Sequence, residues 1–244
     1  MKKVCIIIGS RANYSSIKSA MVAINAHPEL ELQIVATASA ILDRYGSVVN
    51  LVEIDGFQVV ERLHTLIEGE TPLTMAKSTG VGLIELSSTF DRLSPDVVVT
   101  VGDRFETMAT TLAAAYMNIP IAHTMGGEVT GTIDESIRHA VTKFSHIHFA
   151  ACSDAAKRIV RLGENPSHVF NVGCPRIDLV VDILSSDKGL DDQIFECGVG
   201  GPLRLSEPFL LVSQHPVTTE YADAQNQILE TLIAVSYTHL TLPT

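Results

Sequence analysis

Two glycine-rich segments carry most of the side chains in this sequence that can do acid–base chemistry. In the first, Asp103 and Arg104 follow Gly102 directly, at the end of the Val-rich run Asp96–Val101. The second segment adds imidazoles, carboxylates and a guanidinium, at His123, Glu128, Asp134, Arg138 and His139. Such a cluster on glycine-rich loops is typical of a chemical site, because packing alone has no use for so many ionisable groups. We therefore expect a site that moves protons and holds an anionic substrate group.

The elements that must position these side chains alternate between strand and helix. Short apolar runs predict strands at Val4–Ile8, Leu32–Thr37, Gln58–Arg62, Asp96–Val101, Ile121–His123, Ile147–Ala150 and His168–Asn171. Helices are expected from about Ser15 to Asn25, over Val48–Asp55 and from Thr74 to near Leu93. This alternation predicts an α/β fold with a doubly wound, Rossmann-like parallel sheet. Two strand ends then bring both segments to one edge of the sheet, where open α/β sheets bind ligands.

The composition narrows the class of partner. The 244 residues carry a formal net charge of −11, which argues against a nucleic-acid partner because its phosphates would be repelled. An anionic nucleotide stays compatible, since a few local cations and helix N-termini are enough to hold it. No apolar run reaches the length of a membrane span, and Met1-Lys2-Lys3 precedes only five apolar residues, too few for a signal peptide. A membrane partner is not expected, and the cytoplasm is the expected location.

Cysteine and histidine spacing gives little sign of a cofactor. The four cysteines show no C-x-x-C spacing and are expected to be buried, reduced thiols: Cys5, Cys152, Cys174 and Cys197. His146 and His148 lie two residues apart on an expected strand, and without a third ligand a structural role is favoured over a metal pair. No G-x-G-x-x-G pattern of dinucleotide binders follows the first strand. Neither a metal nor another cofactor is expected.

The first strand-to-helix loop, Gly9–Ser15, is a candidate anion site. Its backbone N–H groups and the helix N-terminus attract negative charge, Arg11 adds a planar donor suited to a diphosphate, and Ser15 adds a hydroxyl. The structural alternative is that Asn13 or Ser15 only caps the helix.

Asp103 and His123 have structural alternatives as well. Asp103 can cap the helix that follows it, although a cap does not explain Arg104 at the positive end of the same helix. His123 can be a hydrogen-bonded core residue, although the glycines that follow indicate a close approach to the backbone.

The segment Thr132–Glu135 fits a capping box, in which the Thr hydroxyl and the Glu carboxylate satisfy helix donors reciprocally. That assignment leaves Asp134 available for chemistry. Asp134 and Arg138 lie four residues apart, however, and can simply pair along the helix.

The domain organisation changes near residue 185. We expect a first Rossmann-like domain over residues 1–184, a linker rich in Asp, Gly and Pro over residues 185–208, and the start of a truncated second domain over residues 209–235. In the second domain, Phe209–Ser213 is expected to be a strand and Asp223–Ile233 a helix. Residues 236–244 neither continue the helix nor begin a convincing strand, and we expect this tail to be non-native.

Four motifs resemble one enzyme family. The runs GDRFET, HTMGGEVTGTIDESIRHA, VGCPRID and SQHPVTTE occur in this order and are similar to the hydrolysing UDP-N-acetylglucosamine 2-epimerases of sialic-acid-type and legionaminic-acid-type biosynthesis. The resemblance extends from Lys3 to about Ile233. It implies a glycosyltransferase-B-type fold with the nucleotide sugar in the cleft between two Rossmann-like domains. It also implies release of UDP and N-acetylmannosamine by elimination to a glycal and hydration, and a homo-oligomer, dimer or tetramer, when full-length.

The resemblance gives roles to individual residues. The expected catalytic residues are Asp103, Asp134, Glu128 and His123. The expected substrate and nucleotide contacts are Arg11, Ser15, Arg104, Arg138, His139 and His215, the last reaching across the cleft toward the phosphates. This sequence departs from several relatives, which have a catalytic Glu where Met125 stands here. The acid and the base therefore stay unassigned, and so does the 2-acetamido sugar.

Two other classes of function stay open at this level. The same fold serves glycosyltransferases that use a nucleotide sugar, and fold alone does not separate the two reactions. A nucleotide-binding fragment without activity is the third class. Because only the start of the second domain is expected, we expect this chain by itself to be inactive.

Overall fold

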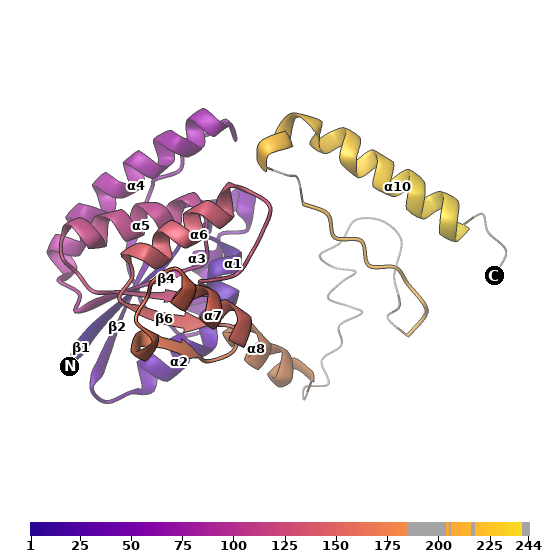
Figure 1. Cartoon of the computed structure of the whole chain (residues 1–244). Coiled ribbons are helices and arrows are strands. Elements are labelled where there is room, and N and C mark those ends of the chain that lie inside the picture. Colours follow the sequence, from indigo (N-terminus) through magenta and orange to yellow (C-terminus); the bar gives the residue numbers. More distant parts are fainter. Residues whose placement is uncertain (185–203, 205, 216–217, 241–244) are drawn as a thin grey trace. The chain divides into compact units, whose positions relative to one another are not determined.

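A computed structural model gives the fold of residues 1–184, 204, 206–215 and 218–240 (Figure 1). The chain divides into two compact units, Met1–Val181 and Asp182–Thr244, which are described separately here. No helix among the described residues is long and apolar enough to cross a membrane.

The first unit is built on a seven-stranded sheet with the strand order β3-β2-β1-β4-β5-β6-β7. All neighbouring strands are parallel. The strands are β1 (Lys2–Ile8), β2 (Leu30–Thr37), β3 (Val59–Leu63), β4 (Val97–Val101), β5 (Ile121–Thr124), β6 (Ile147–Ala150) and β7 (Val169–Asn171). The predicted doubly wound parallel sheet is confirmed, because each predicted strand of this unit is present within two residues of its expected bounds.

Helices cover both faces of this sheet. They are α1 (Arg11–Ser15), α2 (Lys18–Ala26), α3 (Val48–Ile54), α4 (Pro72–Leu93), α5 (Phe105–Tyr116), α6 (Ile133–Phe144), α7 (Ser153–Arg161) and α8 (Pro175–Leu184), with short 3₁₀ turns η1 (Ala38–Ile41), η2 (Asp43–Tyr45) and η3 (Pro166–His168). Residues of β1 alternate between the two faces. Ile6 and Ile8 pack with Met21 of α2, whereas Cys5 and Ile7 pack with Phe90 of α4. This period of two is expected of a strand buried on both faces.

The first helical segment differs from its prediction. We expected one helix from about Ser15, but the structure has α1 from Arg11 and a second helix, α2, after a break at Ser16 and Ile17. The helix begins early because Ser10 is the N-cap, and its side chain accepts a hydrogen bond from the backbone N–H of Asn13 at 3.2 Å. The structural alternative, in which Asn13 or Ser15 caps this helix, was therefore wrong.

The cysteines differ from their prediction in part. Cys5 is fully buried in β1, and burial raises the pKa of its thiol to about 12. Cys152, however, is exposed at the start of α7, and Cys174 is half-buried. The expectation of buried thiols was thus wrong for Cys152, because it stands in the exposed turn after β6. Cys197 lies outside the described residues.

The second unit has one described α-helix, α10 (Ala224–Leu240), preceded by the 3₁₀ segment η4 (Thr218–Asp223). The predicted strand Phe209–Ser213 was wrong, since its backbone is irregular and no strand pairs with it among the described residues. The predicted helix is confirmed, but it continues to Leu240 instead of ending before Ser236. No proline or glycine interrupts residues 224–240, so the backbone has no reason to stop earlier. The linker falls mostly outside the described residues, and the domain bounds and the non-native tail stay predictions.

Candidate functional site

The candidate site lies where two neighbouring strands end. Val101 of β4 and Thr124 of β5 are register partners, so the turns that follow them start side by side. Gly102, with φ +78°, lets the chain leave β4 sharply toward Asp103. The longer turn after β5 leads through Glu128 to α6. Both sequence-predicted segments therefore reach one edge of the sheet, as expected.

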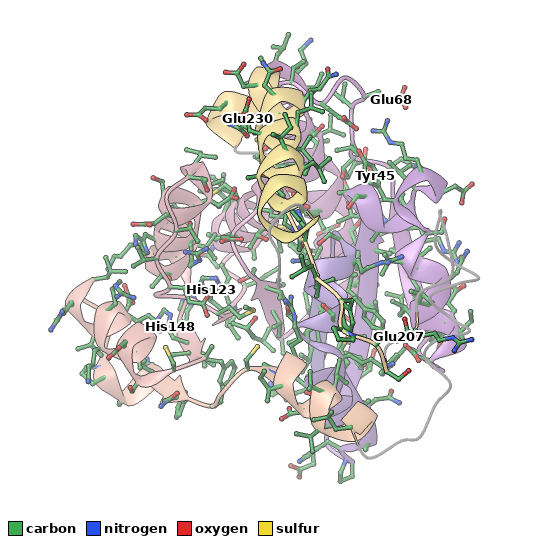
Figure 2. All side chains as sticks on the ribbon, turned by 90° about the vertical axis from the view of Figure 1, so that its right-hand side faces the viewer. Tyr45, Glu68, His123, His148, Glu207 and Glu230 are labelled. Carbon is green, nitrogen blue, oxygen red and sulfur yellow. The ribbon has the colours of Figure 1, made fainter. Side chains whose placement is uncertain are left out.

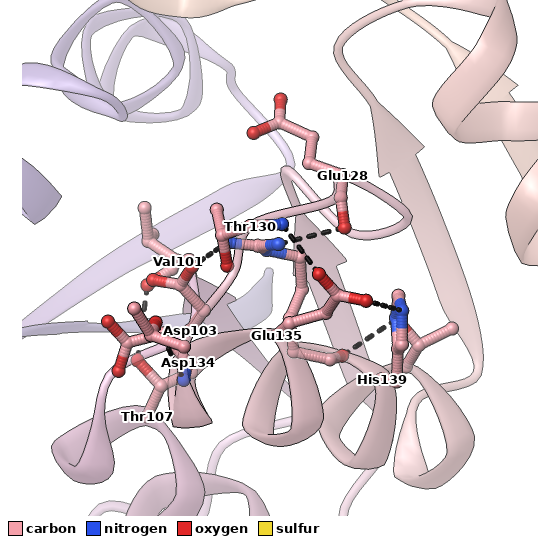
Figure 3. Close-up of polar contacts among 12 residues, drawn as sticks. Val101, Asp103, Thr107, Glu128, Thr130, Asp134, Glu135 and His139 are labelled. Carbon is pink, nitrogen blue, oxygen red and sulfur yellow. Dashed lines mark hydrogen bonds and ion pairs between the residues drawn. The ribbon is translucent and has the colours of Figure 1, made fainter. Parts of the chain in front are cut away.

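Arg138 joins these two turns, which carry Asp103 and Glu128, both labelled in Figure 3. Its guanidinium is buried, with a side chain 4% exposed, and donates through Nη2 to the Asp103 carboxylate. Through Nη1 it also donates to the backbone carbonyl of Glu128, at 2.8 Å. An arginine can serve two acceptors in this way because its donors form a rigid fork.

This contact decides two structural alternatives. Asp103 does not cap α5, whose N-cap is Arg104 and has no side-chain capping bond. Arg138 pairs with Asp103 and makes no ion pair with Asp134, although the two are four residues apart on α6. Within the described part of the chain, the Asp134 carboxylate has no hydrogen bond or ion pair, so it stays available to a ligand.

The start of α6 was predicted correctly only in part. Thr132 is the N-cap, and its hydroxyl accepts from the N–H of Asp134 at 3.3 Å. The expected reciprocal bond was wrong, because Glu135 reaches past Thr132 and accepts from the N–H of Thr130 at 2.7 Å. Glu135 thereby closes the loop instead of completing a capping box. It also lies 3.7 Å from Nε2 of His139, one turn further along the helix.

Glu128 occupies a half-buried position on the glycine-rich turn. In Figure 3 its carboxylate extends away from the Asp103–Arg138 pair, while its own carbonyl accepts from Arg138. Burial raises the pKa of the Glu128 carboxyl above its usual range, and the charge of Arg176 opposes this shift. A carboxyl group with a raised pKa is suited to donate a proton near neutral pH.

His123 lies in the protein core, next to the turn at Gly102. Its ring is fully buried (0% exposed), Nε2 lies 2.9 Å from the carbonyl of Gly102, and Nδ1 lies 3.3 Å from the hydroxyl of Thr142. Burial lowers the pKa of His123 to about 4, so the ring is neutral near pH 7. A Cβ at Gly126 would lie 2.9 Å from Nδ1, which explains the close backbone approach expected at this glycine. The geometry thus supports the hydrogen-bonded core alternative.

His146 and His148, for which a structural role is expected, lie in different surroundings. His146 precedes β6, is exposed, and accepts from the N–H of Ile121 at 3.2 Å. His148 lies in β6 beside His123 of β5 (Figure 2). It is buried, and its Nε2 lies 3.4 Å from the carboxylate of Glu164. Among the residues that the structure describes, no three His, Cys, Asp or Glu side chains are grouped to hold a metal ion.

The first loop lies next to the same strand end. Asn13 accepts from the N–H of Gly9 at 3.1 Å and donates to the carbonyl of Val101 at 3.0 Å, which ties α1 to the end of β4. Arg11 is exposed, and its guanidinium lies against Gly46, where a Cβ would come within 2.7 Å of Nη2. The Ser15 hydroxyl donates to the carbonyl of Ala12 at 3.2 Å. The structure places both candidates on α1, but their nucleotide contacts stay predictions.

Sequence reasoning missed two residues near the site. Glu106 of α5 is buried under the first loop, 3.0 Å from Nε of Arg104. Arg176 of α8 donates to the hydroxyl of Ser16 at 2.6 Å, and its charge acts on Glu128. The motifs GDRFET and VGCPRID contain these two residues, and charged positions within quoted motifs were the available signal. His215 is exposed in the second unit, and its place in the site stays a prediction.

Comparison with known proteins identifies the family. The family model described as UDP-N-acetylglucosamine 2-epimerase matches residues 22–243. A UDP-N,N'-diacetylbacillosamine 2-epimerase (hydrolyzing) of Legionella pneumophila is 30% identical over 98% of this chain and 62% of its own length. A UDP-N-acetylglucosamine 2-epimerase of Neisseria meningitidis is 33% identical over 90% of this chain and 56% of its own length. The chain therefore spans less than two thirds of these curated relatives.

Solved structures show the same fold. The UDP-GlcNAc 2-epimerase of Methanocaldococcus jannaschii, in complex with UDP-GlcNAc and UDP, matches 80% of this chain and 53% of that chain, with a TM-score of 0.70 and 22% identity. The predicted fold class and the resemblance read from the four motifs are both confirmed. This chain belongs to the UDP-N-acetylglucosamine 2-epimerase family.

Proposed function

We propose that the protein is a hydrolysing 2-epimerase. It converts UDP-N-acetylglucosamine, or a related nucleotide-linked 2-acetamido sugar, to N-acetylmannosamine, or its analogue, and UDP. Two of the curated relatives carry the word hydrolyzing in their names, and a third is named polysialic acid biosynthesis protein P7. The proposal extends to a cytoplasmic location and a homo-oligomer.

One observation carries the proposal: the shared strand edge presents three carboxyl groups in three different environments. Asp103 is fixed by Arg138, Asp134 has no partner among the described residues, and Glu128 is half-buried with a raised pKa. Acid–base chemistry at one carbon needs groups that differ in this way, because one must hold a proton while another accepts one.

The reaction proposed for this site has two steps. A base removes the C2 proton, a C1=C2 double bond forms, and the C1–O bond breaks with its electron pair leaving on UDP. Water then adds a hydroxyl group to C1, and C2 receives a proton from the opposite face. We assign Glu128 as the proton donor because of its raised pKa, and Asp134 or Asp103 as the base.

The anionic leaving group needs cations and N–H donors close to it. The nucleotide contacts that we propose are Arg11, Ser15, Arg104, His139 and His215. Arg138 is buried in its ion pair with Asp103, so its proposed role is to fix the two site turns. His123 is buried in the core. We likewise propose that it supports the turn at Gly102 through the hydrogen bond to the Gly102 carbonyl and makes no contact with substrate.

The experiment incubates UDP-GlcNAc with the protein in D₂O without an acceptor sugar and follows the products by proton NMR. We expect UDP and N-acetylmannosamine labelled at C2. The 244-residue chain is compared with a chimera, in which the part of the Legionella relative beyond the match is appended. We expect turnover by the chimera and none by the 244-residue chain alone, because closure around a substrate needs both walls of a cleft. A folded, UDP-binding chimera that leaves UDP-GlcNAc intact would contradict the proposal.

A further inference from the structure

Glu106 is a buried carboxyl group that the site chemistry above does not use. Glu106 is the second residue of α5 and is only 6% exposed. Among the described residues, neither of its carboxyl oxygens has a hydrogen bond. Burial raises the pKa of this carboxyl group, and the charge of Arg104 opposes the shift. Because a buried carboxyl group costs free energy unless it is paired, its position here needs a reason beyond helix packing.

Its surroundings place Glu106 at the junction of two loops. A Cβ at Gly9 would lie 2.6 Å from Cγ of Glu106, so the first loop rests directly on this side chain. A cavity of about 10 Å³ is bordered by Gly9, Asn13, Thr100 and Glu106, with room for about one water molecule. The side chain thus supports the backbone from beneath and is closed off from bulk solvent.

The single ion-pair partner of Glu106 is Arg104, within the described part of the chain. Nε of Arg104 lies 3.0 Å from Oε1, and the Arg104 side chain is 48% exposed. The contact uses the inner nitrogen of the guanidinium. Among the described residues, it therefore leaves the two terminal nitrogens, which form the fork that binds phosphate or carboxylate in two places, without an ion pair.

Arg104 stands where a cation is otherwise disfavoured. It is the N-cap of α5, at the positive end of the helix dipole. The Arg104 guanidinium also lies over the Phe105 ring, 5.8 Å from its centroid, on the exposed side. A long side chain that is not held in place loses rotamer freedom on binding a ligand. The Glu106 carboxyl group lies on the buried side, 3.0 Å from Nε, and holds the Arg104 side chain in one place.

We propose that Glu106 is a positioning residue, which holds Arg104 through Nε so that its two terminal nitrogens face the diphosphate of the nucleotide sugar. The identity of the anion rests on the proposed function, whereas the fixing of Arg104 does not. In this arrangement Glu106 touches no substrate atom. It removes in advance the entropy cost of ordering Arg104.

The first test measures UDP binding by calorimetry in the chimera described above. The variants are Glu106→Gln, Arg104→Gln and the double variant, with Glu53→Gln as matched control because Glu53 forms an exposed pair with Arg62. We expect about a tenfold weaker affinity in each single variant and the same tenfold loss in the double variant, since residues that act through one another are not additive. An unchanged affinity in Glu106→Gln, or a double loss of about 100-fold, would overturn the proposal.

The second test does not depend on UDP. The ¹⁵N relaxation of the Arg104 Nε–H group is measured in the unmodified chain, in Glu106→Gln and in the more conservative Glu106→Asp. A rigid Nε–H group in the unmodified chain that becomes mobile in a folded Glu106 variant supports positioning. A mobile group in the unmodified chain overturns it, whether or not the variants fold. A rigid Nε–H group in a chain whose chimera binds no UDP counts against the proposed function alone.

Discussion

Arg138 donates to Asp103 across 35 residues of chain, and this buried contact makes the turn after β4 and the helix α6 one unit. Neither partner can move without the other, because the guanidinium has almost no access to solvent. The carboxylate stays partly exposed, with a side chain 24% accessible. The pair is therefore both a support for the fold and a fixed charge at the edge of the site.

Replacing Arg138 with Met should destabilise the fold. The change leaves the Asp103 carboxylate without its cation, and removal of one partner of a buried pair costs about 3 kcal/mol. Urea unfolding followed by circular dichroism gives this value. Arg62→Met, which breaks an exposed pair with Glu53, is the matched control and should cost below about 1 kcal/mol. Equal losses in the two variants would mean that the Arg138 pair contributes no more than a surface contact.

Replacing Asp134 with Asn should separate chemistry from folding. Its carboxylate has no partner among the described residues, so the free energy of unfolding should stay within about 0.5 kcal/mol. Turnover of UDP-GlcNAc by the chimera should fall about 100-fold or more, the loss typical of an acid–base group. Asp154→Asn, an exposed carboxylate on α7, is the control and should leave turnover unchanged. Turnover like that of the unmodified chimera would remove Asp134 from the proposed site.

Asp103→Asn should also lower turnover by about 100-fold, for the same chemical reason. It differs from Asp134→Asn in stability, because the new amide leaves the buried guanidinium of Arg138 without a counter-charge. Unfolding and turnover measured on the same preparations test both statements. A stability equal to that of Asp134→Asn would show that the ion pair is not what fixes Asp103.

The resemblance of the four motifs implies a glutamate in several relatives at the position of Met125. In the structure it has φ +62° and donates its N–H to the carbonyl of Phe149. If a carboxylate at this position selects the sugar, Met125→Glu should change the ratio of turnover between UDP-GlcNAc and a diacetamido analogue. If Glu128 already supplies the needed carboxylate, the extra carboxylate of Met125→Glu should leave turnover unchanged or lower it. If the ratio is unchanged and Glu128→Gln abolishes turnover, the second case is supported. If the ratio is unchanged and Glu128→Gln also leaves turnover unchanged, both cases are contradicted.

The stability of the fold should fall as the pH drops below about 6.5. His123 is buried as the neutral ring with a pKa of about 4, whereas in the unfolded chain its pKa is near 6.5. The unfolded state therefore binds the proton first, and the free energy of unfolding decreases between pH 6.5 and pH 4. From pH 6.5 to pH 5 the contribution is about 2 kcal/mol. Urea unfolding should show this slope in the unmodified chain and in His27→Asn, an exposed control. The slope should be shallower in His123→Asn, where buried His148, whose pKa burial also lowers, still contributes in the same direction. The same slope in all three would assign it to other groups.

Local sequence patterns determined most of the sheet. The apolar runs of β1, β2 and β4 are recognisable because a strand buried on both faces must be continuously apolar. The gathering of Asp103 and Glu128 at one edge also followed from sequence, since parallel strands end on the same side. The break after Ser15 was not predictable from periodicity, because the cap that starts α1 early at Ser10 depends on one side-chain hydrogen bond.

Only the tertiary structure decided which charged groups meet. Sequence spacing offered Asp134 as the partner of Arg138, one helical turn away, but the folded chain pairs Arg138 with Asp103 from another strand end. Likewise, Glu106 reads as an ordinary acidic residue in the first turn of a helix, and only the packing of the Gly9 loop above it shows that it is buried. Local patterns determine elements because backbone geometry and burial repeat with a fixed period. Long-range pairs of charges have no such period, so they follow from the fold as a whole.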